Sequence, residues 1–118
     1  PAAVPDLVRT VLTRVGLSIA DVDLLLPHQP SVRVLERIAE RLGVGFDRVA
    51  TNMHRYGNTA GASVGVVLDE ANRSGRLADG AVVVLAAVGS GWTWGAAVLR
   101  WPDRARMLRH AGGVTTRP

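Results

Sequence analysis

The run Ala81–Val88 constrains the fold of this chain more than any other feature of its sequence. All eight of its residues are apolar, a pattern typical of a strand that is covered on both faces. Asp79-Gly80 predicts a turn before this strand, and Gly89-Ser90-Gly91 predicts another after it. The chain then returns as a second strand over 92–101. We therefore predict a β-hairpin with other elements packed on both of its faces.

Three segments have the 3.6-residue apolar period of amphipathic helices. They span 5–15, 30–42 and 59–74, and a glycine follows each, at Gly16, Gly43 and Gly75. Pro30 suits the first position of the second helix, and Val32 falls on its apolar face. The first turns of the third helix consist of small residues, so we expect another element to pack closely against them.

A third strand is predicted over 21–26, where Pro27 ends it, and a loop over 54–58 precedes the third helix. Helices that alternate with strands predict a layered α/β domain. Three strands and three helices make a thin domain, and the first helix begins almost at residue 1. We therefore expect the sequence to start inside a larger fold, with one domain over 1–101 and a basic, flexible tail over 102–118.

The basic charge of the chain does not indicate a nucleic-acid-binding protein. The net charge is +4, but residues 1–101 hold ten arginines against nine aspartates and glutamates, so most of the excess lies in the tail. All fourteen basic residues are arginine, a bias that fits a GC-rich genome better than selection for phosphate contacts. No apolar run reaches the roughly 18 residues of a membrane span, and no signal peptide is recognisable. We expect a cytoplasmic protein that binds neither nucleic acid nor membrane.

The chain contains no cysteine, which excludes a disulfide framework, a thiolate zinc site and a cysteine nucleophile. Residues 61–65 fit the G-x-S-x-G pattern of serine hydrolases, in which the serine directly follows a strand. Here a polar turn and a predicted helix start precede Ser63, so we reject a serine nucleophile. No metal site is expected.

Three polar positions each allow a structural and a functional interpretation. His28 follows the carboxyl end of a predicted buried strand, where α/β sheets place functional groups, but a turn can also hold a histidine by hydrogen bonds. Asn58 can cap the next helix or offer its amide to a ligand. The turn around Ser90 needs glycines as any hairpin does, and it also exposes backbone N–H groups that can bind an oxyanion.

The order and spacing of these positions match one known arrangement. Asp23-Leu24-Leu25-Leu26-Pro27-His28-Gln29 is followed by Arg55-Tyr56-Gly57-Asn58-Thr59 and then by Gly89-Ser90-Gly91-Trp92-Thr93-Trp94-Gly95, with Asn58 thirty residues after His28. This pattern resembles the C-terminal part of β-ketoacyl-acyl-carrier-protein synthase III, in the thiolase superfamily. The resemblance covers about residues 4–101. It implies part of a thiolase-like layered α/β fold, with a mixed sheet and packed helices, that is incomplete on its own.

The resemblance also implies roles for individual residues. In that family a cysteine on the N-terminal half takes an acyl group from acyl-coenzyme A, and the acyl-enzyme condenses with malonyl carrier protein as carbon dioxide leaves. His28 and Asn58 would donate hydrogen bonds to the malonyl thioester oxygen as the enolate forms. The backbone N–H of Ser90 would help to bind the oxyanion at the acyl-cysteine. Arg33 would dock the acidic acyl carrier protein.

These roles imply a set of partners and leave one alternative open. No permanently bound cofactor is expected; acyl-coenzyme A and malonyl carrier protein are the implied substrates, in fatty-acid or polyketide biosynthesis. Pro30-Ser31 stands where the family commonly has Ala-Asn, whose asparagine touches the pantetheine arm, so other acyl donors stay open. The implied partners are the missing N-terminal half, acyl carrier protein and a second copy in a homodimer. Alone, this chain is predicted to be inactive. The alternative is a non-catalytic module of the same fold that binds carrier protein or self-associates.

Overall fold

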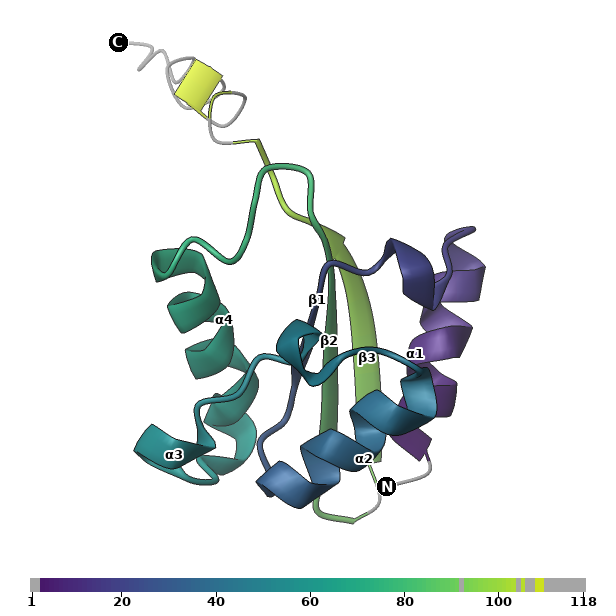
Figure 1. The fold of residues 1–118 in the computed structure, drawn as a ribbon, viewed down its shortest axis with the longest axis vertical. Helices are drawn as coiled ribbons and strands as arrows, with labels where there is room; N and C mark the ends of the chain where they lie inside the picture. Colours follow the sequence, from purple (N-terminus) through teal and green to yellow (C-terminus); the bar gives the residue numbers. More distant parts are fainter. Residues whose placement is uncertain (1–2, 92, 104, 106–107, 110–118) are drawn as a thin grey trace, which may run out of the picture.

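The computed structural model describes residues 3–91, 93–103, 105 and 108–109. Its sheet has three strands in the order β1 (Leu24–Pro27), β2 (Val82–Gly89) and β3 (Thr93–Arg100) (Figure 1). β1 runs parallel to β2, and β2 runs antiparallel to β3 with Gly89 opposite Thr93. The predicted hairpin is therefore confirmed, and the sheet is mixed.

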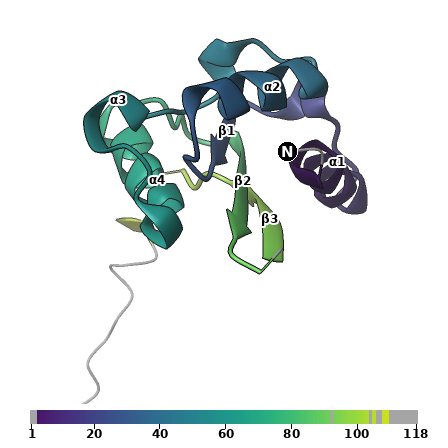
Figure 2. The ribbon, with the colours of Figure 1, turned by 90° about the horizontal axis from the view of Figure 1, so that it is seen from below.

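Helices cover the sheet on both faces (Figure 2). α1 (Ala3–Arg14) and α2 (Val32–Leu42) lie on one face, while α3 (Met53–Tyr56) and α4 (Ser63–Arg73) lie on the other side of the molecule. Short 3₁₀ turns occur at Ile19–Asp21, Phe46–Arg48 and Ala60–Ala62. This arrangement confirms a layered α/β fold.

The alternation of side chains along β2 creates two separate apolar cores. Val82, Val84 and Ala86 join a core with buried residues of α1 and α2. Val83 joins a second core with buried residues of α4. At the start of β1, Asp23 fixes the register, because its N–H donates to the carbonyl of Val82 and its carboxylate accepts from the N–H of Val82. The apolar run that dominates the sequence is therefore the central strand of the sheet.

The structure corrects the predicted start of the second helix. α2 begins at Val32, and Ser31 is its N-cap, with Oγ accepting from the N–H of Val34 at 3.3 Å. Pro30 lies before the cap and is not the first helical residue. Val32, predicted on the buried face, is 43% exposed. The predicted end at Gly43 is confirmed by its φ of +73°.

Two further predictions are wrong in detail. The segment predicted as a loop over 54–58 contains the short helix α3. The third predicted helix begins as a 3₁₀ turn, and its α-helical part starts only at Ser63. Its early residues Gly61 and Gly65 are exposed, and a Cβ added to either would meet no atom within 4 Å. The described residues thus place no element against the small-residue side of α4.

The carboxyl half of β2 also differs from the prediction of a strand covered on both faces. Val82–Val84 is buried, but Ala87, Val88 and Gly89 are exposed. The end of the hairpin is therefore accessible. Within the described residues, no helix has the length and apolar character needed to cross a membrane. Most of the predicted tail lies outside the described residues.

Candidate active site

His28 stands at the carboxyl end of β1, where its backbone continues the pairing with β2. The N–H of His28 donates to the carbonyl of Ala86 at 2.7 Å. Because this bond extends the parallel ladder by one residue, it fixes the backbone of His28 at the edge of the sheet where functional groups of α/β proteins gather. His28 itself is half-buried.

The turn after His28 is held by the side chain of Gln29, which is completely buried. Its Nε2 donates to the carbonyls of Pro27 and Ala50, at 2.9 and 3.1 Å, and its Oε1 accepts from the N–H of Asn52 at 3.2 Å. One amide therefore satisfies three backbone groups that no strand or helix pairs. The role of Gln29 is not evident from the sequence, where its only signal is a place beside His28 between two prolines after a buried strand.

Ser63 contacts the ring of His28 from the first position of α4. Its Oγ lies 2.6 Å from Nδ1 of His28 and 3.4 Å from the backbone nitrogen of Gln29. Ser63 is 1% exposed and follows a 3₁₀ turn, which differs from the exposed serine after a strand in serine hydrolases. The rejection of a serine nucleophile therefore agrees with the structure. The contact with His28 was missed, because 35 residues separate the two in sequence.

Asn58 lies exposed in the loop between α3 and α4, and a local hydrogen bond fixes its amide. Its Oδ1 accepts from the N–H of Ala60 at 2.9 Å, an Asx turn that ties the side chain to the start of the next element. Gly57 before it has φ +64° and ψ −150°, a conformation that residues with a Cβ rarely adopt. The oxygen of Asn58 thus makes a local turn bond, although the N-cap of the following 3₁₀ turn is Thr59 and not Asn58. Nδ2 has no hydrogen-bond partner among the described residues.

The loop that carries Asn58 is held at its base by a second polar cluster. Nδ2 of Asn52 donates to Glu70 of α4 at 2.8 Å, and Arg55 of α3 forms an ion pair with the same carboxylate at 3.0 Å. These contacts join α3 to α4.

The structure brings three of the sequence-predicted site residues to one cavity. This cavity of about 330 Å³ is lined by His28, Asn58 and Ser90, with Ser63 and the exposed end of β2. We call it the His28–Asn58 cavity. A second cavity of about 250 Å³ shares His28 and Val88 with it and is otherwise lined by Pro30 and by apolar residues of α1, α2 and the sheet. Polar donors thus lie next to an apolar hollow, a combination typical of small-molecule sites.

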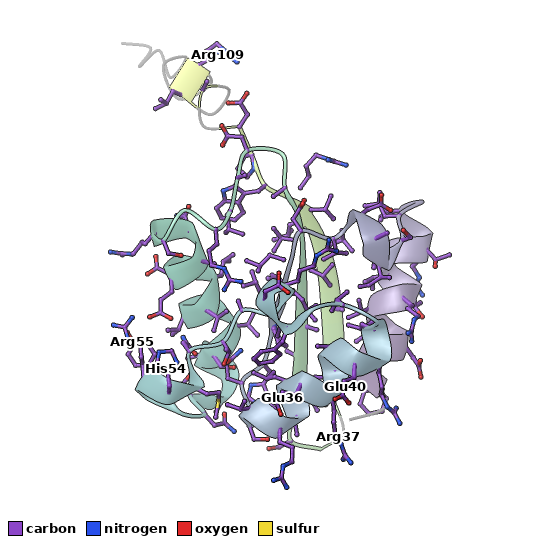
Figure 3. The ribbon with its side chains drawn as sticks, viewed as in Figure 1. Glu36, Arg37, Glu40, His54, Arg55 and Arg109 are labelled. Carbon is purple, nitrogen blue, oxygen red and sulfur yellow. The ribbon has the colours of Figure 1, made fainter. Side chains whose placement is uncertain are left out.

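The fourth predicted residue, Arg33, lies apart from this cavity in the first turn of α2. It is exposed, as are Arg37 and Arg41, and Figure 3 shows Arg37 with Glu36 and Glu40 along the outer surface of this helix. Among the described residues, none of these three arginines forms an ion pair with either glutamate. The guanidinium of Arg41 is free of ion pairs there, while its carbonyl accepts from Arg9.

The chain matches one protein family over most of its length. The model of the family described as 3-oxoacyl-[acyl-carrier-protein (ACP)] synthase III C terminal matches residues 12–101. The β-ketoacyl-[acyl-carrier-protein] synthase III of Desulfitobacterium hafniense (strain DSM 10664 / DCB-2) is 48% identical over 93 residues, which are 79% of this chain and 28% of that protein. The synthase III of Desulfotalea psychrophila is 42% identical over 99 residues, 84% of this chain and 31% of that protein.

Solved structures give the same result. The crystal structure of 3-oxoacyl-(acyl carrier protein) synthase III from Pseudomonas aeruginosa matches with a TM-score of 0.81 and 42% identity, over 85% of this chain and 31% of that one. The synthase III from Aquifex aeolicus matches with a TM-score of 0.83 and 36% identity, over 85% of this chain and 32% of that one. This chain thus spans less than a third of the length of these relatives.

Proposed function

This chain belongs to the family of 3-oxoacyl-[acyl-carrier-protein] synthase III C-terminal domains. We therefore propose that it is the part of an acyltransferase that supplies the hydrogen-bond donors of the active site. The complete enzyme condenses an acyl thioester with malonyl carrier protein as carbon dioxide leaves. One observation carries the proposal: His28 and Asn58 line one cavity, and each side chain keeps one nitrogen without a hydrogen-bond partner among the described residues. Those nitrogens are Nε2 of His28 and Nδ2 of Asn58. His28 is held through Nδ1 and Asn58 through Oδ1.

Two such nitrogens suit the charge that develops in a decarboxylation. As the bond from the malonyl α-carbon to the carboxylate breaks, its electrons move toward the thioester carbonyl and an enolate forms. A neutral imidazole N–H and an amide N–H are both donors. Donors that are fixed before the reaction stabilise the developing oxyanion more than the neutral carbonyl, which lowers the barrier.

We also propose that the turn of the hairpin binds an oxyanion through a backbone N–H group. Ser90 lines the same cavity, between Gly89 and Gly91, at the exposed end of β2. Its backbone N–H would bind the oxyanion of the acyl-cysteine, and because the donor is main-chain, a serine serves in place of the family's usual glycine.

The nucleophile of this reaction lies on another part of the complete protein. The chain has no cysteine, and it spans less than a third of its relatives. The small-residue side of α4, which no described residue covers, supports the proposal that an N-terminal half packs there. That half would supply the cysteine. Without that half, this chain is inactive. A cytoplasmic homodimer that uses acyl-coenzyme A, in fatty-acid or polyketide biosynthesis, stays a prediction.

A graft tests the roles of His28 and Asn58. Residues 4–101 replace the matching segment of the Desulfitobacterium hafniense synthase III, and malonyl carrier protein decarboxylation is measured. We expect His28→Ala and Asn58→Ala each to lower the rate roughly 10²–10³-fold. His54→Ala is the control, because His54 is exposed on α3 and does not line the cavity.

Asn58→Asp separates the two interpretations of Asn58. The aspartate keeps the oxygen that accepts from Ala60, so the turn and the melting temperature should be retained. It loses the amide donor and adds a negative charge beside the enolate, so the rate should fall at least as far as with Asn58→Ala. Unchanged decarboxylation in His28→Ala and both Asn58 variants would refute the proposal.

A second candidate function rests on the arginines of α2. Because Arg33, Arg37 and Arg41 are exposed and unpaired with the glutamates beside them, this face is available to an acidic carrier protein. A non-catalytic module of the same fold would bind carrier protein and lose affinity with salt and with Arg33→Glu. It would show no activity in the graft, whereas the proposed enzyme half shows both binding and turnover.

A further inference from the structure

The contact between Ser63 and His28 bears on which ring nitrogen carries the proton. Oγ of Ser63 and Nδ1 of His28 are 2.6 Å apart, a distance that only a hydrogen bond explains. Two arrangements fit it: either the ring donates to the hydroxyl, or the hydroxyl donates to the ring. They leave opposite protonation states at Nε2, the nitrogen that has no partner among the described residues.

The surroundings of Ser63 distinguish the two arrangements. A hydroxyl has one hydrogen and two acceptor lone pairs, and the N–H of Gln29 already points at Oγ from 3.4 Å. If the ring also donated, the hydroxyl hydrogen would be buried without an acceptor, because Ser63 is 1% exposed and the described residues offer no other partner. Leaving a buried donor unpaired is costly. The arrangement in which Ser63 donates pairs both its hydroxyl hydrogen and Nδ1 of His28.

We propose that Ser63 is a positioning residue that donates its hydroxyl hydrogen to Nδ1 of His28 and thereby keeps the ring proton on Nε2. This deepens the proposed function, on which its catalytic meaning rests, since only a protonated Nε2 can donate to an enolate oxygen in the His28–Asn58 cavity. The burial of Ser63 and Gln29 holds this arrangement in place. In the opposite tautomer Nε2 is an acceptor and repels the oxyanion.

Nitrogen-15 NMR of this chain tests the inference without any catalytic assay. Spectra are recorded at about pH 9, where a histidine ring of ordinary pKa is neutral, and His54→Asn and His110→Asn variants identify the His28 signals. We expect Nε2 of His28 to give the shift of a protonated nitrogen and Nδ1 that of a hydrogen-bonded acceptor. A protonated Nδ1 in the unchanged chain overturns the proposal.

Variants of Ser63 then show whether the serine is the cause. In Ser63→Ala both ring shifts of His28 should move toward the averaged values of an exposed histidine such as His54, and Ser63→Thr should restore them because it keeps the hydroxyl. Ser74→Ala is the matched control, since this serine lies at the other end of α4 and its hydroxyl donates to Ala71. Ring shifts that stay unchanged in Ser63→Ala contradict the proposal.

Two readouts keep the outcomes distinct. The backbone amide spectrum reports whether Ser63→Ala is folded, and if it is not, the tautomer of the unchanged chain decides alone. In the graft, Ser63→Ala should lower kcat about tenfold with little change in KM, and Ser63→Thr should recover it. If His28→Ala has no effect in the graft while Nε2 is protonated, the proposed function fails and the role of Ser63 in fixing the ring stands.

Discussion

At the scale of single residues, the candidate site depends on buried polar side chains that hold its backbone and the His28 ring in place. Gln29 ties the turn after β1 to the backbone of residues 50–52, and Ser63 ties the ring of His28 to α4. A buried polar group is tolerated only when it is paired. Both side chains meet this condition by pairing with groups at the site, so stability and site geometry are coupled here.

Replacing Gln29 by methionine should therefore destabilise the chain strongly. Methionine has a similar volume but leaves the carbonyls of Pro27 and Ala50 and the N–H of Asn52 unpaired, each at a cost of about 1–3 kcal/mol when buried. We expect the free energy of unfolding, measured with urea, to fall by at least about 2 kcal/mol. Glu36→Met, on the exposed face of α2, should change it by less than about 0.5 kcal/mol. Equal effects of the two variants would mean that the amide of Gln29 is dispensable.

At the scale of elements, the sequence was most informative where the pattern is long and periodic. The hairpin and the three long helices were predicted, because apolar spacing and flanking glycines are local signals. α3 was missed, since a four-residue helix carries no period. Residues His28, Asn58 and Ser90 were predicted from a family pattern, whereas Ser63 and Gln29 were missed because burial and contacts between distant residues are tertiary properties.

The start of α2 shows how a local signal can be displaced by one or two residues. Pro30 fits the first turn of a helix, yet Ser31 is the N-cap. Ser31→Ala should therefore lower the free energy of unfolding by about 1 kcal/mol, because the N–H of Val34 loses its side-chain acceptor and keeps only the carbonyl of residue 31. Ser31→Asp should retain the stability, since a carboxylate also accepts from that N–H. If Pro30→Ala costs more than Ser31→Ala in the same urea titrations, the proline rather than the serine defines this end.

At the scale of the whole molecule, the chain is a domain with one face left open. The outer strand β3 is exposed along most of its length, and the small-residue side of α4 faces no described residue. The relatives that it matches are more than three times as long as the matched segment. A face of glycines suits a second element that approaches α4 closely; the sequence predicts such an element, and none of the described residues provides it.

Gly65→Ala should consequently have opposite effects on the chain and on the complete enzyme. In this chain Gly65 is exposed in α4 and an added Cβ meets nothing, so the free energy of unfolding should rise by about 0.5–1 kcal/mol, the usual gain for glycine to alanine within a helix. In the graft, the same methyl group should obstruct close packing of the N-terminal half and reduce decarboxylation.

Thr10→Ala serves as the control, because it also raises helix propensity on an exposed helix face but lies on α1, across the sheet from α4. It should stabilise this chain and leave the graft active. If Gly65→Ala stabilises both proteins and the graft keeps its full rate, the missing half does not approach this side of α4. Its docking surface then has to be sought elsewhere, first along the exposed strand β3.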